Sequence, residues 1–254
     1  MYQGISVKDE GVLRIITMTR PERRNSLSEA HLLELDDALA EAAASDARAV
    51  ILAAEGPVFS SGHDFKDMQG RDLRELERLM EICAAVMQRI PAMPQSVVAQ
   101  LEGLATAAGT QLVASCDLAV AGESTSFRLP GSRAGLACTT PAVAVARAVG
   151  RKRALEMLLT GAPIDAATAL DWGLVNRVVP DEEVAAASRE LALSTTHGSM
   201  VASAIGKRSF FKQVDLPLPQ AYDYATKVMA SAATLPAAQE NMAAFIEKRP
   251  AVYD

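Results

Sequence analysis

Strand-like and helix-like segments alternate along the first two thirds of the chain, and this alternation limits the fold more than any other feature. Short apolar runs rich in β-branched residues occupy positions 12–18, 49–53, 97–101 and 118–120. Helical periodicity follows in residues 28–43, in residues 72–90 before Pro91, and in residues 106–115. The pattern predicts stacked β and α units, and therefore an α/β protein.

The chain changes character after Pro180, where strand-like runs disappear. Alanine-rich segments with helical periodicity cover residues 182–193, 201–213, 220–233 and 237–248. With 254 residues and 50% hydrophobic content, the chain is long enough for a large core and an extension. We therefore expect a core domain over residues 1–180 and a helical oligomerisation region over residues 181–254.

Two segments share one local pattern, in which an apolar run leads into a turn of small residues and then into a helix start. The first covers residues 58–68 with Gly62 at its turn, and the second covers residues 105–117 with Gly109. One such glycine indicates only a turn or a cap. Two helix starts, however, can aim two backbone N–H groups at one oxygen atom, which is the geometry of an oxyanion hole.

In their order and spacing, these two segments resemble the enoyl-CoA hydratase/isomerase (crotonase) superfamily. The resemblance runs from about residue 12 to about residue 249, and further matching stretches are residues 20–28, 127–136, 148–161, 173–179 and 245–249. Residues 61–64, 104–109 and 136–141 are most similar to the enoyl-CoA hydratase domain-containing protein 3 branch. The resemblance implies a crotonase-like right-handed spiral of repeated ββα units with a C-terminal helical trimerisation region.

The resemblance also implies an acyl-CoA thioester as ligand, whose carbonyl oxygen is held by the backbone N–H groups of His63 and Ala108. Coenzyme A enters as part of the substrate, so neither a separate cofactor nor a metal is expected. The His63 imidazole is either an acid/base group or, as we favour, a side chain that projects toward the adenosine part. Further substrate contacts are expected from the two turns, at Ser61, Gly62, Asp64, Phe65, Ala107 and Gly109. Three basic residues are expected near coenzyme A, namely Arg24, Lys66 and Lys248. Near the acyl group we expect Ser132, Arg133, Cys138 and Thr139.

Hydratases of this superfamily use two glutamates, and this chain has Gln111 and Gly131 at the matching positions. An amide can orient a water molecule but cannot take its proton, and glycine offers no functional group. Other branches place an acid where this chain has Cys138 or Thr139. Cys138 is either a thiolate or, as we favour, a small buried residue. Efficient hydration is therefore not expected, and the combined changes Gln111→Glu and Gly131→Glu are expected to raise it.

Charge and cysteine content exclude several other classes of partner. The formal net charge of −6 gives no general attraction to nucleic acid or to anionic membranes. The three cysteines have no pairing or metal-ligand spacing, which is typical of a reducing compartment. No run reaches the roughly 18 apolar residues that span a bilayer. We therefore expect a cytoplasmic protein without membrane insertion. Separately, the alanine-rich tail and the trimerisation region that the resemblance implies predict a homotrimer, or a hexamer made of two trimers.

Three functions remain open from the sequence. The first is an acyl-CoA-binding member of the superfamily that stabilises a thioester enolate, of lyase or isomerase type if it is an enzyme. The second is a CoA-thioester hydrolase, isomerase or decarboxylase that needs only enolate stabilisation. The third is a non-catalytic acyl-CoA-binding protein.

Overall fold

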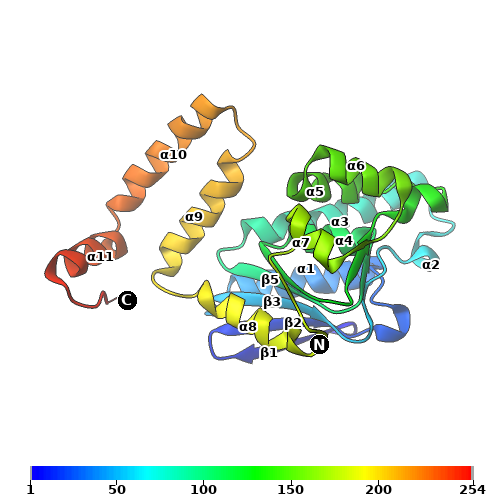
Figure 1. The fold of residues 1–254 in the computed structure, drawn as a ribbon, viewed down its shortest axis with the longest axis horizontal. Helices are drawn as coiled ribbons and strands as arrows, with labels where there is room; N and C mark the ends of the chain where they lie inside the picture. The colour runs from blue at the N-terminus through cyan, green and yellow to red at the C-terminus, as the bar shows by residue number, and fades with distance from the viewer. Residues whose placement is uncertain (1, 253–254) are drawn as a thin grey trace.

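The computed structural model describes residues 2–252, which form a mixed α/β core and a helical arm that projects from it (Figure 1). The strands are β1 (Ile5–Glu10), β2 (Leu13–Met18), β3 (Ala49–Ala54), β4 (Val58–Ser60), β5 (Ser96–Leu101), β6 (Leu104–Thr106), β7 (Leu118–Gly122), β8 (Ser126–Arg128), β9 (Ile164–Asp165) and β10 (Arg177–Val179). The helices are α1 (Glu29–Ala43), α2 (Phe65–Met68), α3 (Leu73–Ala92), α4 (Ala108–Ser115), α5 (Thr139–Val149), α6 (Arg151–Thr160), α7 (Ala166–Trp172), α8 (Val184–Ser194), α9 (Met200–Gln213), α10 (Leu218–Ala233) and α11 (Pro236–Glu247), with short 3₁₀ turns η1 (Pro21–Arg23), η2 (Pro130–Ala134) and η3 (Asp181–Glu183).

Successive strands enter two different sheets. The large sheet has the order β1-β2-β3-β5-β7-β10, and the small sheet has the order β4-β6-β8-β9. From β3 to β8, each pair of consecutive strands gives its first strand to the large sheet and its second to the small sheet, and equivalent strands of successive pairs run parallel. The chain therefore advances as a spiral of ββα units, which confirms the fold expected from the resemblance.

The helices pack as their periodicity predicts, with one difference. In α1 the residues Leu32, Leu35 and Leu39 are fully buried, and Ser28 caps the helix by accepting a hydrogen bond from the His31 N–H. Helix α3 was expected to end before Pro91, but it continues to Ala92. That expectation was wrong. Pro91 costs the last turn only one backbone hydrogen bond, and the turn is still closed by the Met93 N–H, which donates to the Arg89 carbonyl.

The helical C-terminal region has two parts. Helix α8 lies on the large sheet, where Ala192 is buried together with residues of β2, β3, β5 and β7. Helices α9, α10 and α11 form the arm, which leaves the core in Figure 1. The structure thus places α8 with the core, whereas the division at residue 180 stays a prediction. None of the helices within residues 2–252 is both long and apolar enough to cross a membrane.

The partly buried Lys207 connects the arm to the core. The Lys207 Nζ on α9 donates to the Asp117 carboxylate at 2.6 Å and to the Ile90 and Gln95 carbonyl oxygens, both at 2.7 Å. Burial lowers the pKa of Lys207 and raises that of Asp117, while the attraction between the two charges opposes both shifts. Asp117 therefore has a structural role, and Lys207 is a partner that the sequence did not reveal.

Candidate functional site

Three parallel strands of the small sheet end at the same edge. Ser60 of β4 pairs with Ala105 of β6, which in turn pairs with Phe127 of β8. The turns that follow these strands contain His63, Ala108 and Gly131. Parallel strands carry ligand sites at their carboxyl ends, because the following turns meet there. The fold thus brings together positions that lie up to 68 residues apart in the chain.

The first turn leaves the backbone N–H of His63 free. The Leu27 N–H donates to the Gly62 carbonyl oxygen at 2.8 Å, and the Asp64 N–H donates to the Leu27 carbonyl oxygen at 3.3 Å. Peptide groups alternate in direction along an extended segment, so the His63 N–H points away from Leu27. Among the hydrogen bonds of residues 2–252, none has this N–H as donor.

The second turn is strained and presents the N–H of Ala108. Ala107 has φ 53° and ψ −119°, a conformation that residues with a Cβ rarely adopt. Its N–H donates to the Arg128 carbonyl at 3.0 Å, and the Thr110 hydroxyl donates to the Ala105 carbonyl at 2.9 Å. Ala108 is the first residue of α4, so its N–H lacks an intrahelical acceptor.

The two turns lie directly against each other. Gly62 has φ +82°, and a Cβ built on it would lie 2.9 Å from the Ala107 Cβ and 3.1 Å from the Ala108 nitrogen. A Cβ on Gly109 would collide with the carbonyl oxygen of Ser60. Small residues are therefore required here, because they let two backbone N–H groups from different strands come close together. This geometry supports the expected oxyanion hole.

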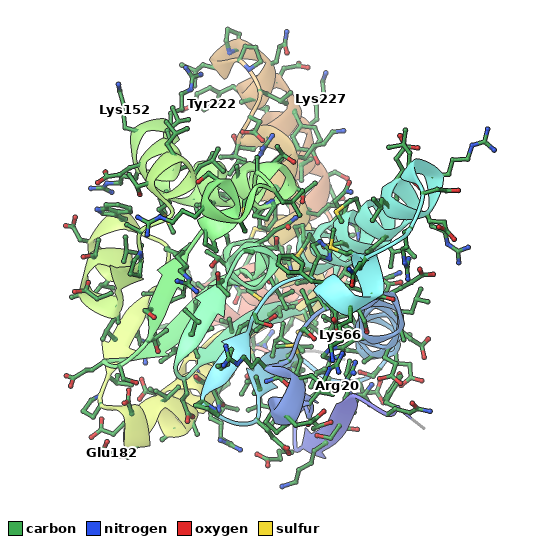
Figure 2. All side chains as sticks on the ribbon, turned by 90° about the vertical axis from the view of Figure 1, so that its right-hand side faces the viewer. Arg20, Lys66, Lys152, Glu182, Tyr222 and Lys227 are labelled. Atoms are coloured by element: carbon green, nitrogen blue, oxygen red, sulfur yellow. The ribbon has the colours of Figure 1, made fainter. Side chains whose placement is uncertain are left out.

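A hollow of about 440 Å³ opens beside the first turn, and we call it the Lys66 hollow. Most of its lining comes from the loop around η1 and from the segment between β4 and α2: Glu22, Arg23, Arg24, Ser26, Ser61, His63, Asp64, Phe65 and Lys66. Figure 2 shows Lys66 and Arg20 on one flank, away from Lys152 and Lys227. The structure thus gathers the expected residues Arg24, Ser61, Asp64, Phe65 and Lys66 around one space.

A buried asparagine that the sequence analysis did not single out shapes this hollow. The Asn25 side-chain amide donates to the Glu55 and Val58 carbonyl oxygens at 2.9 and 2.8 Å, and its oxygen accepts from the Arg20 N–H. Asn25 and Arg24 both have left-handed φ values, 47° and 52°. Asn25 therefore fastens the loop to the start of β4 in a strained form that places Arg24 at the hollow.

Two cations of the hollow are free to meet an anion. The Asp64 carboxylate already has partners within the protein. It accepts hydrogen bonds from Arg23 at 2.8 Å, from the Ser26 hydroxyl and from the Lys66 N–H. Burial raises the pKa of Asp64, but these partners outweigh it and hold the pKa below its usual range. Arg24 and Lys66 make no ion pair within residues 2–252. Asp64 therefore shapes the turn, while Arg24 and Lys66 supply the positive charge.

The His63 imidazole is partly buried and borders the Lys66 hollow. Both ring nitrogens are buried and lack a hydrogen-bond partner within residues 2–252. Burial lowers the pKa of His63, although the Leu27 carbonyl and the Asp67 carboxylate oppose this shift. The ring is therefore neutral near pH 7. Its expected orientation toward an adenosine group stays a prediction.

Sequence and structure comparisons decide the family. The family model for enoyl-CoA hydratase/isomerase matches residues 8–254. The chain belongs to the enoyl-CoA hydratase/isomerase family. It is 46% identical over 250 residues to the rat mitochondrial enoyl-CoA hydratase domain-containing protein 3, covering 98% of this chain and 83% of the relative. These matches confirm the resemblance that was inferred from the two turns.

Solved structures show the same relationship in three dimensions. The crystal structure of human enoyl-CoA hydratase domain-containing protein 3 is 42% identical, with a TM-score of 0.94, and the match covers 99% of this chain and 100% of the human one. An enoyl-CoA hydratase structure from Mycobacterium smegmatis is 40% identical, with a TM-score of 0.94 and 99% coverage of both chains.

The first position where the family resemblance expects a glutamate holds Gln111. Its side chain is 4% exposed, and its carbonyl oxygen Oε1 is buried without a hydrogen-bond partner among the described residues. Helical side chains cover the turn that precedes them, so Gln111 lies over Ala107 and Ala108. The amide is therefore close to the turn at Ala107 and Ala108, but it cannot act as a base near neutral pH.

The second such position holds Gly131, and the surrounding backbone closes around it. A Cβ on Gly131 would collide with the Leu136 carbonyl oxygen and would lie 2.7 Å from the Cys138 sulfur. Burial raises the pKa of the Cys138 thiol, although a hydrogen bond with the Gly131 backbone opposes this shift. The neutral thiol supports the interpretation of Cys138 as a small buried residue.

The remaining expected contacts lie apart from the Lys66 hollow. Ser132, Arg133 and Thr139 are exposed around η2 and the start of α5, and Arg133 donates to the Thr160 carbonyl at 2.6 Å. Lys248 ends α11 on the arm, far from α2 of its own chain in Figure 1. A single chain therefore does not bring Lys248 to the hollow.

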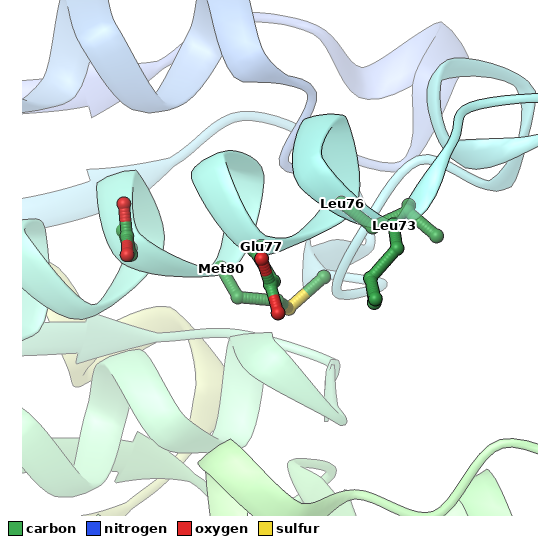
Figure 3. A pocket seen from close by; sticks show the side chains of 5 residues that line it. Leu73, Leu76, Glu77 and Met80 are labelled. Carbon is green, nitrogen blue, oxygen red and sulfur yellow. The ribbon is translucent and has the colours of Figure 1, made fainter.

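A second hollow of about 440 Å³ lies on helix α3 and was not predicted (Figure 3). Leu73, Leu76 and Met80 line it together with Glu77 and Glu81. The apolar spacing of three and four residues along α3 was the signal in the sequence.

No group of three or more His, Cys, Asp or Glu side chains within residues 2–252 is arranged to hold a metal ion.

Proposed function

We propose that this protein binds acyl-CoA thioesters and stabilises the thioester enolate with the backbone N–H groups of His63 and Ala108. The observation that supports the proposal is the close contact of Gly62, which precedes His63, with Ala107 and the Ala108 nitrogen at the ends of β4 and β6. Preorganised donors of this kind each contribute roughly 10²- to 10³-fold in rate to reactions that develop an oxyanion.

The Lys66 hollow supports the same proposal. Arg24 and Lys66 supply unpaired positive charge beside the first turn, and coenzyme A carries phosphate groups. The net charge of −6 makes such local cations necessary, and they act within about 8 Å at physiological salt. We propose that the adenosine phosphates bind at this hollow while the thioester lies at the turns.

Proton transfer limits which reaction follows. Gln111 and Gly131 supply neither acid nor base, and the loss of a positioned acid or base typically lowers a rate by roughly 10² to 10⁴. The enclosure of Gly131 favours the two other candidates, a CoA-thioester hydrolase, isomerase or decarboxylase and a non-catalytic acyl-CoA-binding protein. These alternatives keep the oxyanion donors but need no glutamate pair.

Calorimetry with acetyl-CoA, crotonyl-CoA and longer acyl-CoAs tests binding. We expect saturable binding of each thioester, and no detectable heat at millimolar ligand would refute the main proposal.

Mass spectrometry of a CoA-thioester panel then separates the reactions, since water addition, hydrolysis and decarboxylation change the product mass differently. Unchanged substrates despite tight binding would support the non-catalytic alternative.

We also propose a homotrimer or a hexamer of two trimers. The arm exposes large apolar side chains that a neighbour can cover, namely Phe210, Phe211, Leu218, Tyr222, Met229, Phe245 and Ile246. Light scattering that shows a monomer at micromolar concentration would refute this assembly.

We propose a cytoplasmic location, whereas the names of the relatives state a mitochondrial one. Cell fractionation distinguishes the two.

A further inference from the structure

Gln111 on α4 has a buried side-chain oxygen to which no group of the protein donates. The residue is only 4% exposed, and its Oε1 has no hydrogen-bond partner within residues 2–252. The backbone of Gln111 is satisfied, because its N–H donates to the Ala107 carbonyl oxygen at 3.1 Å and its carbonyl oxygen accepts from the Ser115 hydroxyl. Buried acceptors normally have a donor, and leaving one without it is costly. The side-chain oxygen therefore lacks a donor that a ligand can supply.

Hydroxyl groups on the neighbouring segments do not fill this role. The Ser60 and Thr110 hydroxyls donate to backbone carbonyl oxygens instead, both at 2.9 Å. The Thr106 hydroxyl is itself without a partner within residues 2–252, so it does not bond Gln111 either. A hydroxyl group on a ligand carries the missing hydrogen, whereas a carbonyl or carboxylate oxygen carries none. The chemistry of the amide oxygen thus favours a ligand with a hydroxyl group.

The position of α4 brings Gln111 to the acyl side of the proposed thioester site. The small sheet has the order β4-β6-β8, the Lys66 hollow lies beside the turn after β4, and α4 follows β6. The two substituents of a thioester carbonyl point in different directions. With the carbonyl between the two turns and the CoA part in the hollow, the acyl group therefore extends over the turn after β6. The Gln111 side chain covers that turn at Ala107 and Ala108.

We propose that Gln111 is a specificity-determining binding residue, whose amide oxygen accepts a hydrogen bond from a hydroxyl group on C3 of the acyl chain. C1 is the thioester carbonyl and C2 becomes part of the planar enolate, so C3 is the first carbon that can direct a hydroxyl out of that plane. The protein thus prefers 3-hydroxyacyl-CoA thioesters to saturated ones, and one configuration at C3 to the other. This inference rests on the proposed acyl-CoA site and names the acyl group that the site selects.

Calorimetry with butyryl-CoA and with the two enantiomers of 3-hydroxybutyryl-CoA tests the inference. The wild type is expected to bind one enantiomer about tenfold more tightly than butyryl-CoA, because its hydroxyl gives the buried acceptor a donor. Gln111→Met removes the acceptor with little change in side-chain length, so it should bind all three ligands within about threefold of one another. Gln88→Met is the matched control, because it makes the same exchange at an exposed position of α3 and should keep the preference.

The possible results separate the inference from the proposed function. Equal affinity of the wild type for butyryl-CoA and both enantiomers overturns the inference and leaves the proposed function intact. An unchanged preference in Gln111→Met also overturns it, since another residue then recognises the hydroxyl. A wild type that binds none of the three ligands refutes the proposed function itself. If Gln111→Met does not fold, Gln111→Leu replaces it, with the same expected loss of preference.

Discussion

The sulfur atom of Cys138 lies 2.7 Å from the position that a Cβ on Gly131 would occupy, and the Leu136 carbonyl oxygen lies nearer still. The thiol and the backbone therefore fill the space through which a side chain at position 131 would leave the main chain. Gly131 does not have a positive φ. Its enclosure, rather than its backbone conformation, closes this position to an acidic side chain.

Gly131→Ala is expected to lower the free energy of unfolding by about 1–3 kcal/mol, because the new methyl group overpacks an enclosed site. Gly206→Ala in α9 is the control, since no atom lies within 4 Å of its added Cβ. Alanine is a better helix former than glycine, so the control should be neutral or stabilising. Urea unfolding measures both, and equal stability of the two variants would contradict the enclosure.

Gly62→Ala is expected to weaken acyl-CoA binding by tenfold or more, because its Cβ would press on Ala107 and the Ala108 nitrogen. Gly70→Ala is a close control. Gly70 has φ +83°, nearly the +82° of Gly62, but nothing lies within 4 Å of its added Cβ. Both variants carry the same backbone strain, and calorimetry should show weaker acyl-CoA binding for Gly62→Ala alone. Similar losses in both would mean that strain, not contact with the donors, is responsible.

Gln111→Glu is expected to raise crotonyl-CoA hydration by about tenfold or more over Gln111→Met, because a carboxylate can accept the proton of water. Burial should raise the pKa of this glutamate above about 4.3, so its turnover should increase with pH as the acid ionises. Adding Gly131→Glu should not raise turnover further, contrary to the expectation from sequence, since that side chain does not fit. Pre-steady-state and steady-state assays from pH 5 to 8 measure these effects, and a pH-independent rate for Gln111→Glu would argue against its role as base.

Acid should destabilise the protein through the buried His31 and the partly buried His63. Burial lowers the pKa of His31 and of His63 below the ordinary value of about 6.5. The unfolded chain therefore takes up protons at a pH where the folded chain does not. The free energy of unfolding should fall below pH 6.5, by at most about 1.4 kcal/mol per pH unit for each histidine. Urea unfolding at pH 7.5 and 5.5 tests this, and His31→Gln with His63→Gln should flatten the decline.

Lys207→Met is expected to lower the free energy of unfolding by about 3–5 kcal/mol, because Asp117 is left as a buried charge without its partner. The combined variant with Asp117→Asn should recover part of this loss, since no unpaired charge remains. A double-mutant cycle by urea unfolding gives the coupling. Additive losses would show that the two residues act independently.

Local patterns in the chain were enough to predict most helices and strands and the positions of the two turns. Regular apolar spacing placed α1 and the arm helices within a few residues, because burial of one helical face depends on local periodicity. The small residues around Gly62 and Gly109 identified the turns, since only small residues permit such close backbone approach. The positions without glutamates were readable from the matching segments alone.

Which distant groups meet became visible only in the folded chain. The contact between Gly62 and Ala107, the pairing of Lys207 with Asp117 and the closure around Gly131 join residues through sheet register and packing. The folded chain also distinguishes Asp64, which forms an ion pair with Arg23, from Arg24 and Lys66, which form none within residues 2–252. Such facts cannot be read from local patterns, because hydrogen bonding, burial and charge pairing depend on neighbours that lie tens of residues away in the chain.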